Sequence, residues 1–353
     1  MIYSEFKGIR IAGIAAAVPE GVVEIESLKA AEDPQMIDNF IKKTGIKKIH
    51  KGNPTQTAAD YSFTAATALR ESGKYSPEEI GVLIDVTQNP DYRTPSTACA
   101  LHKRLGLEKS CLAFDINLGC SGFVYGVSVA ASILSTSNAQ KALVLVGDSL
   151  ARRRRQDFER TSNTALLFGD ASTAILLEKK EGFTINSALM SDGTGHKALS
   201  TPYQAWKHPE GPETVPGDDI AVFNFTISEV PALLKEFLTE TGTTIEDYDA
   251  LVLHQANMMI MKQIAKKVKM PMDKVPVSLD QFGNTSGASV PLTIVNTYGE
   301  ENGGRNLKLL TSGYGVGLSW GVVSFEIMDT DILPLVISHD TYDDGYPDNR
   351  SDQ

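Results

Sequence analysis

The segment CLAFDINLGCSGFVYGVSVAASILS, residues 111–135, predicts a buried strand that runs directly into a helix. The strand covers residues 111–118, and the helix begins at about Phe123 and is rich in small residues. The turn between them reads Gly-Cys-Ser-Gly and places the thiol of Cys120 at a helix N-terminus. Backbone N–H groups and the helix dipole favour anions there, so the pattern predicts a nucleophile held partly as a thiolate. The alternative is a structural cysteine, because free cysteine is also a common small core residue.

The composition is that of an ordinary globular protein. The 353 residues are 42% hydrophobic and 22% charged, with a mean hydropathy of -0.13. No signal peptide is recognisable and no apolar run is long enough to span a bilayer, so we expect a cytoplasmic protein without a membrane partner. The net charge of -11 argues against nucleic acid as a partner. Three cysteines without a C-x-x-C pair support neither a disulfide framework nor a metal site.

Apolar strand patterns alternate with helix patterns along the whole chain, which predicts an α/β protein with sheets covered on both faces. In the first half the expected strands cover residues 9–17, 82–87, 111–118, 142–146 and 164–177, with helices at 57–71 and 96–105. A polar stretch at 191–219 follows, and the second half has expected helices at 228–239, 257–269 and 289–298 and strands at 250–253, 275–279, 307–311 and 318–327. The similar order of elements in the two halves suggests a duplicated core.

Polar side chains follow three of the expected strands. Cys120 follows residues 111–118, His254 follows 250–253 in Leu-His-Gln-Ala-Asn, and Asn284 follows 275–279 in Gly-Asn-Thr-Ser-Gly. Ligands of α/β sheets gather outside the carboxyl ends of strands, so we expect the three groups to face one pocket. Taken singly, a hydrogen-bonded structural histidine and a turn-forming asparagine are the alternatives.

Glycines alternate at Gly313, Gly315 and Gly317 between two expected strands. This segment lacks both the GxGxxG spacing before a helix and a Walker lysine, so it is not a phosphate loop. It predicts either exposed backbone N–H groups that hold an oxyanion or a tight hairpin with close strand approach.

Basic residues form two local clusters on this acidic chain. In the helix after His254, the lysines 262, 266 and 269 share one face, with Lys267 further round, opposite an apolar stripe. Such a face is either solvated or a docking surface for an acidic partner. The run Arg152–Arg155 binds a phosphate, pairs with Asp157 and Glu159, or has no specific role.

From about Gly8 to Ile327 the chain resembles the β-ketoacyl-acyl-carrier-protein synthase III family of thiolase-fold condensing enzymes. The resemblance rests on Cys-Ser-Gly-Phe at Cys120, His-Gln-Ala-Asn at His254, Gly-Asn-Thr-Ser at Asn284 and the closing Gly-x-Gly-Leu-Ser-Trp-Gly loop. It implies a thiolase-like duplicated α-β-α-β-α five-layer fold and a homodimer. Residues 1–180 would form the half with the nucleophile and 181–328 the half with His and Asn. Residues 329–353 would form an acidic extension that is disordered or packs its apolar cluster on the body.

The resemblance also implies a reaction. Cys120 would accept an acyl group from a thioester of coenzyme A or of a carrier protein, and malonyl-acyl carrier protein would then lose carbon dioxide. His254 Nε2 and Asn284 Nδ2 would stabilise the enolate, and the backbone N–H groups of Cys120 and Val316 would hold the oxyanion. The product is a β-ketoacyl thioester for fatty-acid initiation or a specialised pathway. No metal or redox cofactor is expected.

By the same resemblance, Lys262, Lys266 and Lys267 would dock the acidic acyl carrier protein. Other positions depart from the family pattern. Where relatives that use acetyl-coenzyme A commonly have a Trp and an Arg, this chain has Asn39 and Lys43, and Met259 replaces an Arg beyond His-Gln-Ala-Asn. Thr94 stands where a Phe commonly bounds the partner's acyl pocket. We therefore expect a longer or branched acyl group rather than acetyl.

Two other functions use the same residues. A papain-like thiol hydrolase also has Cys, His and Asn in this order, although Cys120 lies in the middle of the chain and nothing indicates that Asn284 orients the histidine. A catalytically silent partner of another condensing subunit is the second alternative, and retention of all three polar groups argues against it.

Overall fold

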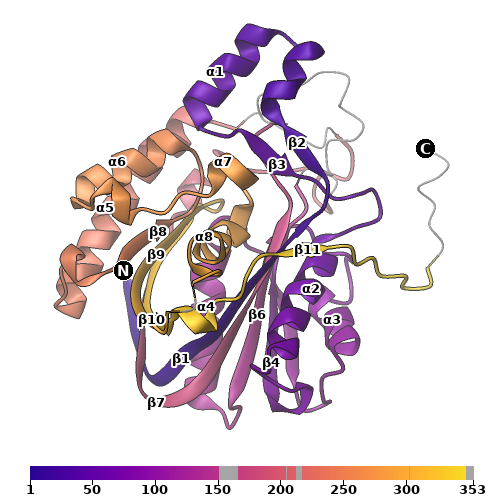
Figure 1. Ribbon diagram of the computed structural model, residues 1–353, viewed down its shortest axis with the longest axis vertical. Coiled ribbons are helices and arrows are strands. Elements are labelled where there is room, and N and C mark those ends of the chain that lie inside the picture. The colour runs from indigo at the N-terminus through magenta and orange to yellow at the C-terminus, as the bar shows by residue number, and fades with distance from the viewer. Residues whose placement is uncertain (151–165, 204, 212–216, 302, 347–353) are drawn as a thin grey trace.

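The computed structural model describes residues 1–150, 166–203, 205–211, 217–301 and 303–346 (Figure 1). The helices are α1 Pro34–Thr44, α2 Ala58–Glu71, α3 Thr97–Leu105, α4 Gly122–Thr136, α5 Asp219–Thr241, α6 Met258–Val268, α7 Leu279–Phe282 and α8 Ser289–Tyr298. The strands are β1 Ile2–Pro19, β2 Val22–Glu24, β3 Lys48–His50, β4 Ile80–Val86, β5 Leu112–Ile116, β6 Lys141–Asp148, β7 Ala171–Ser191, β8 Ala250–Leu253, β9 Asn306–Gly315, β10 Ser319–Met328 and β11 Val336–Ser338. The run Arg152–Arg155, with Asp157 and Glu159, lies outside the described residues.

Two long strands, β1 and β7, connect the two halves of the chain. Residues 9–17 of β1 pair with 172–179 of β7, and this part of the sheet continues through β6 and β4 to β5. Residues 2–7 of β1 pair with 184–189 of β7, and that part continues through β10 and β9 to β8. Among the described residues, each half therefore has five of these strands, two of which it shares with the other half, and the short β11 pairs with the end of β1 in the first half. The boundary predicted at residue 180 falls inside β7.

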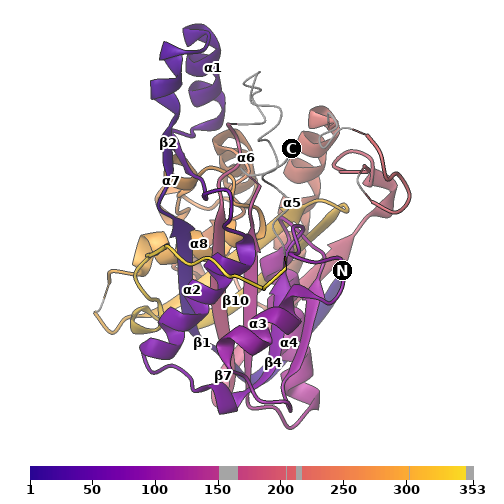
Figure 2. The same ribbon diagram turned by 90° about the vertical axis from the view of Figure 1, so that its right-hand side faces the viewer.

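Three apolar cores separate five layers (Figures 1 and 2). The helices α4 and α8 lie in the middle and pack against strands of both halves. On the outer face of the first half, α2 and α3 cover β4, β6 and β7. On the outer face of the second half, α5 and α6 cover β8, β9 and β10. This arrangement is the α-β-α-β-α order that the family resemblance implied.

Small residues let α4 lie between the two sheets. A Cβ atom on Gly126 would come within 2.9 Å of Val144 Cγ1, and one on Gly122 within 2.8 Å of Val86 Cγ1. Contacts under 3.0 Å require backbone or side chains to move, so these positions must stay small for the helix to pack on β4 and β6. The small-residue composition that marked this segment is therefore a packing requirement of the central layer.

One predicted strand is wrong. Residues 275–279 form no strand, and the short helix α7 begins at Leu279. Pro276 has no N–H to donate to a ladder. The side chain of Gln255 instead accepts hydrogen bonds from the backbone N–H groups of Ser278 (3.1 Å) and Leu279 (3.3 Å). A side chain thus replaces the neighbouring strand as the hydrogen-bond partner of this segment.

The sequence interpretation also missed α1, although its end signals are present. Asp33 caps the helix by accepting a hydrogen bond from the N–H of Gln35, Pro34 occupies its first turn, and Gly45 ends it with φ +86°. These are ordinary start and stop signals, and the apolar face between them is narrow. Among the described residues, no helix is both long and apolar enough to cross a membrane.

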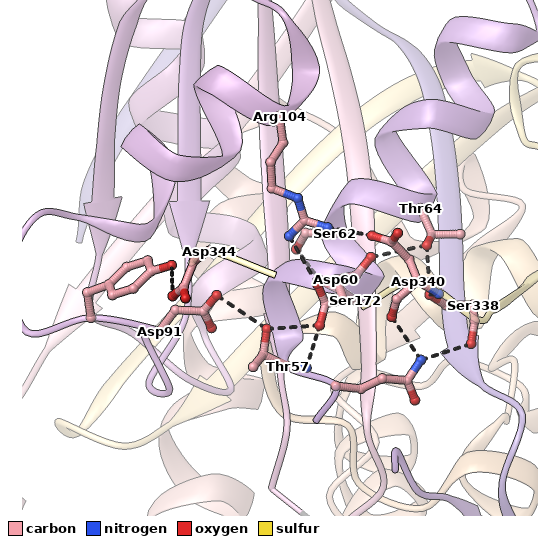
Figure 3. A network of polar contacts seen from close by, with 12 residues as sticks. Thr57, Asp60, Ser62, Thr64, Asp91, Arg104, Ser172, Ser338, Asp340 and Asp344 are labelled. Carbon is pink, nitrogen blue, oxygen red and sulfur yellow. Dashed lines mark hydrogen bonds and ion pairs between the residues drawn. The ribbon is translucent and has the colours of Figure 1, made fainter. Parts of the chain in front are cut away.

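The C-terminal extension contacts the body as far as Asp344, whose carboxylate accepts a hydrogen bond from the Tyr92 hydroxyl (2.8 Å). Strand β11 pairs in parallel with the end of β1, and the neighbouring Leu335 packs against the central core. Figure 3 shows how polar contacts hold the next residues: Arg104 of α3 forms ion pairs with Asp60 of α2 (3.0 Å) and with Asp340. Of the two alternatives for this extension, the packed one is therefore confirmed for the described residues.

Arg104 is the residue whose loss should affect this region most. Its side chain is 5% exposed and that of Asp60 is 2% exposed, whereas Asp340 is 34% exposed. Replacing Arg104 by Ala leaves the Asp60 carboxyl buried without a compensating cation, which costs about 3–5 kcal/mol of unfolding free energy. Replacing Asp340 by Asn removes a partly solvated charge and should cost less than about 1 kcal/mol. Urea unfolding of both variants measures the difference; equal losses would contradict the assignment.

Candidate active site

Cys120 lies in the turn between β5 and α4, one residue before the helix N-cap Ser121. The turn is tight, because the N–H of Gly122 donates to the carbonyl oxygen of Gly119 at 2.6 Å. The hydroxyl groups of Ser121 and Ser319 lie 2.7 Å apart and tie the turn to β10. The side chain of Cys120 is partly exposed, whereas Ser121 is buried. The thiol is therefore placed at a helix N-terminus as predicted.

The glycine-rich segment at the β9–β10 hairpin packs directly against Cys120. A Cβ atom on Gly315 would lie 3.0 Å from the Cys120 sulfur, and one on Gly313 would lie 2.9 Å from the Cys120 carbonyl oxygen. The backbone N–H groups of Cys120 and Val316 both donate hydrogen bonds to the thiol sulfur. The sequence left two interpretations of this segment open: close approach of the strands, or exposed N–H groups that hold an oxyanion. In the structure both hold, because the close approach of the hairpin to Cys120 brings the Val316 N–H within reach of the sulfur.

His254 follows β8 and is buried. Its backbone N–H donates to the Ser312 carbonyl oxygen (2.8 Å), and its own carbonyl oxygen accepts from the Tyr314 hydroxyl (3.0 Å). The ring Nδ1 lies 2.7 Å from the hydroxyl oxygen of Ser289, the first residue of α8. A hydroxyl that donates to Nδ1 leaves the ring proton on Nε2, which then serves as a donor.

Burial lowers the pKa of His254 to about 3, and a backbone hydrogen bond at Ser286 only partly opposes this effect. A histidine with this pKa is neutral throughout the physiological pH range. The ring is therefore available as a neutral hydrogen-bond donor and not as a cation.

Asn284 is held by backbone hydrogen bonds that cross between the two halves. Its N–H donates to the Leu167 carbonyl oxygen (2.9 Å), and its carbonyl oxygen accepts from the Gly169 N–H (3.2 Å). Its side-chain Oδ1 accepts from the Ser286 N–H at 2.9 Å. The amide group therefore presents Nδ2, its donor end, away from that contact. Ser289, and not Asn284, contacts the His254 ring, which differs from the arrangement that the papain-like alternative requires.

Ser286 contacts all three predicted residues, and the sequence interpretation gave it no role. Its hydroxyl is hydrogen-bonded to the Cys120 thiol, its N–H to the Asn284 side chain, and its backbone to His254. It is fully buried and has φ +54°, which is uncommon for a residue other than glycine. The structure therefore brings Cys120, His254 and Asn284 together around one residue. The only sequence signal for Ser286 is its place in the Gly-Asn-Thr-Ser motif.

One electrostatic expectation is wrong. The sequence predicts a nucleophile held partly as a thiolate at the helix N-terminus, but burial, followed by the negative charge of Asp148, raises the pKa of the Cys120 thiol to about 12. The hydrogen bond between the Cys120 thiol and the Ser286 hydroxyl and those from the backbone N–H groups of Cys120 and Val316 lower this pKa, but their effect is weaker. The resting nucleophile is therefore a neutral thiol, because the free energy of burying a thiolate exceeds the stabilisation that its hydrogen bonds provide.

The other residues singled out in the sequence lie on the surface. Lys262, Lys266 and Lys267 are exposed on α6, whose opposite face carries a buried apolar stripe as predicted. Thr94 is exposed between β4 and α3, and Met259 is 52% exposed in the first turn of α6. Asn39 and Lys43 are exposed on α1. A cavity of about 550 Å³ lies elsewhere, between the segments around Glu20, Lys51 and Ser338.

The contact between Gly315 and Cys120 should make Gly315 intolerant of any side chain. In Gly315→Ala, the added Cβ atom would sit 2.6 Å from the Cys120 Cβ and 3.0 Å from its sulfur, so the thiol must move off its two N–H donors. We expect the rate of Cys120 acylation by a thioester to fall roughly 10²-fold, by analogy with loss of one oxyanion donor.

Gly193→Ala is the matched control, because nothing lies within 4 Å of a Cβ atom at that position. Thermal unfolding of both variants separates a local displacement from a loss of fold. Unchanged acylation of Gly315→Ala would show that the thiol does not depend on this contact.

Comparisons with known proteins agree with this geometry. The model of the family described as 3-oxoacyl-[acyl-carrier-protein] synthase III matches residues 114–193, and that of its C-terminal region matches residues 238–327. The chain is 34% identical over 320 residues to the β-ketoacyl-[acyl-carrier-protein] synthase III of Xanthomonas campestris pv. campestris, with 88% of this chain and 96% of that protein covered.

Solved structures are similar over nearly the whole chain. A 3-oxoacyl-(acyl-carrier protein) synthase from Burkholderia xenovorans superimposes with a TM-score of 0.87 at 31% identity, over 96% of this chain and 99% of that one. The priming β-ketosynthase of the R1128 polyketide pathway has a TM-score of 0.78 at 24% identity, covers 93% of this chain and 97% of that one, and shows likeness of fold alone. The predicted thiolase-like fold is confirmed.

Proposed function

The chain belongs to the β-ketoacyl-[acyl-carrier-protein] synthase III family, and from this premise we propose how its own residues carry out the decarboxylative condensation of an acyl group with malonyl-acyl carrier protein. The reaction makes the chain an acyltransferase whose product is a β-ketoacyl thioester. The observation that supports the proposal most is the convergence of Cys120, His254 and Asn284 on Ser286.

In the first half-reaction, the Cys120 sulfur attacks the carbonyl carbon of an acyl thioester and takes over the acyl group. The tetrahedral intermediate carries its negative charge on oxygen. The backbone N–H groups of Cys120 and Val316, which donate to the sulfur in the resting site, are the donors available for that oxygen. The coenzyme A or carrier-protein thiol then leaves.

In the second half-reaction, malonyl-acyl carrier protein loses carbon dioxide, and the electron pair of the broken bond forms a thioester enolate. The Nε2–H of His254 and the Nδ2–H group of Asn284 donate hydrogen bonds to the enolate oxygen. Both donors are neutral, which suits a buried site that must accept a negative charge from the substrate. The enolate carbon attacks the acyl carbon, the bond to Cys120 breaks, and the Cys120 thiolate takes up one proton from solvent to regenerate the neutral thiol.

The proposed chemistry needs only these side chains and two thioester substrates, so the proposal includes no metal or redox cofactor. It includes a homodimer, in which Thr94 of one subunit would border the acyl pocket of the other, and a cytoplasmic location. The pathway is fatty-acid initiation or the synthesis of a related specialised product.

A mass-spectrometric acylation experiment tests the proposed reaction. Incubation with acetyl, octanoyl and branched acyl thioesters should give one acyl adduct, absent in Cys120→Ser, that forms faster with octanoyl or branched donors than with acetyl. The physical reason is the smaller Thr94 at the pocket and the absence of the usual coenzyme A contacts at Asn39 and Lys43. Malonyl-acyl carrier protein should release the adduct, and water alone should not.

The other outcomes have distinct meanings. Release by water indicates a thiol hydrolase, and failure to form any adduct indicates a silent partner subunit. A clear preference for acetyl refutes the acyl-chain proposal and leaves the condensation proposal intact.

Docking of the carrier protein is proposed for the exposed lysines of α6. The double variant Lys262→Glu/Lys266→Glu places negative charge where the acidic carrier protein would bind, which slows productive association. We expect roughly a tenfold higher KM for malonyl-acyl carrier protein with little change in kcat, and a difference that shrinks as salt is added. Lys180→Glu, at an exposed lysine in the middle of β7, is the control with the same type of charge change. Equal effects of the two changes would contradict docking on α6.

A further inference from the structure

A buried carboxylate lies beside Cys120 and has no part in the mechanism described so far. Asp148, the last residue of β6, is 1% exposed. Its Oδ1 accepts hydrogen bonds from the Thr87 hydroxyl (3.0 Å) and from the Gln88 backbone N–H (2.8 Å), and its Oδ2 accepts from Gln88 Nε2 (3.2 Å). The Ser286 hydroxyl is also hydrogen-bonded to this carboxylate.

The Ser286 hydroxyl therefore lies between Asp148 and the Cys120 thiol. Gln88 Nε2 fixes its position by donating to the Ser286 oxygen at 3.1 Å while also donating to Asp148. Gly119, next to Cys120, makes room for this amide, because a Cβ atom there would lie 2.1 Å from Gln88 Nε2. The polar side chains of Thr87, Gln88, Asp148 and Ser286, from three separate parts of the chain, are thus connected by hydrogen bonds beside the sulfur.

The protons available on these side chains determine which one donates and which one accepts in each hydrogen bond. A serine hydroxyl has one proton to donate and two lone pairs to accept with. With Asp148 ionised, the Ser286 proton goes to the carboxylate, and the serine oxygen accepts from Gln88 and from the Cys120 S–H. This arrangement is a continuous proton path from the thiol to the carboxylate.

We propose that Asp148 is the base that receives the Cys120 proton, through Ser286, when the thiol attacks. The S–H bond breaks, its proton passes to the serine oxygen, the serine proton passes to Asp148, and the sulfur lone pair forms the new C–S bond. In the condensation proposed above, on which this part rests, the leaving thiolate regains the proton by the reverse path, so Asp148 ends as it began.

The charge of the site supports this route over a free thiolate. A thiolate formed by loss of the proton to water would place a second negative charge beside Asp148 in a buried region. Transfer to Asp148 keeps one negative charge throughout. Burial also raises the pKa of Asp148, which brings it closer to that of the thiol. Among the described residues, Asp85 of β4 faces Asp148, Tyr314 of β9 faces Cys120, and the neutral His254 after β8 contacts the backbone of Ser286.

The test measures alkylation of Cys120 by iodoacetamide, which requires no acyl or malonyl substrate and is therefore independent of the proposed condensation. It uses a Cys99→Ser background, because Cys99 is exposed, and reads modification at the Cys120 peptide. With the relay, the attacking form has the same proton count as the resting enzyme, so the rate is constant from about pH 7 to pH 9. In Asp148→Asn and Ser286→Ala, only solution hydroxide removes the proton. Their rates should be roughly 10²-fold lower at pH 7 and rise about tenfold per pH unit.

A purely electrostatic role for Asp148 predicts the opposite change in the alkylation rate. If the carboxylate merely repels the thiolate, Asp148→Asn alkylates faster than the parent protein, and Ser286→Ala keeps the parent's pH profile; either result overturns the proposal. Asp85→Asn is the matched control, since it removes another buried carboxyl in the same region and should keep the pH-independent profile. Thermal unfolding confirms the fold of each variant, and Ser286→Ala, which keeps the buried charge, decides the question if Asp148→Asn does not fold.

Discussion

Close contact between backbone segments of the two halves is the constraint on which the site depends. A Cβ atom on Gly287 would lie 2.7 Å from the Gly119 carbonyl oxygen, and Gly315 leaves equally little room beside the Cys120 side chain. The bridge between Phe168 and Asn284 closes a third point of contact. Because the two sheets share β1 and β7, their strand ends are held in one relative position. Loops that need sub-ångström placement are therefore supported by the most rigid elements of the fold.

Desolvation is the common cause of the electrostatic properties of the site. It raises the pKa of the Cys120 thiol and lowers that of the His254 ring, so both groups are neutral at rest. A neutral resting site avoids the cost of buried charge until a substrate brings its own. Fixed hydrogen-bond donors then meet the charge that develops on oxygen, without the reorganisation that water would need. Polar groups in such a site must be fully connected, and Ser286 and Gln88 provide the connections.

Much of the fold follows from local patterns. Helix α8 and strand β8 occupy the residues that the apolar periodicity predicted, and α4 covers the segment that was predicted to be a helix rich in small residues. The same reasoning is wrong for residues 275–279, because the backbone N–H groups of Ser278 and Leu279 donate to the side chain of Gln255 rather than to a neighbouring strand. Apolar content predicts that a segment is buried, but its hydrogen-bond partner decides whether it becomes a strand.

The sequence by itself determined the α/β class, the duplicated order of elements, the thiol at a helix N-terminus and the placement of His254 after a strand. These follow from periodicity and motif order, which are properties of neighbouring residues. Only the tertiary structure decided the proton state of Cys120 and the contacts of Ser286 and Asp148, and it alone showed that β1 and β7 serve both sheets. The burial and the hydrogen-bond partners of these residues depend on segments that lie more than a hundred residues apart in the sequence. A local sequence pattern therefore does not show how far water is excluded from them.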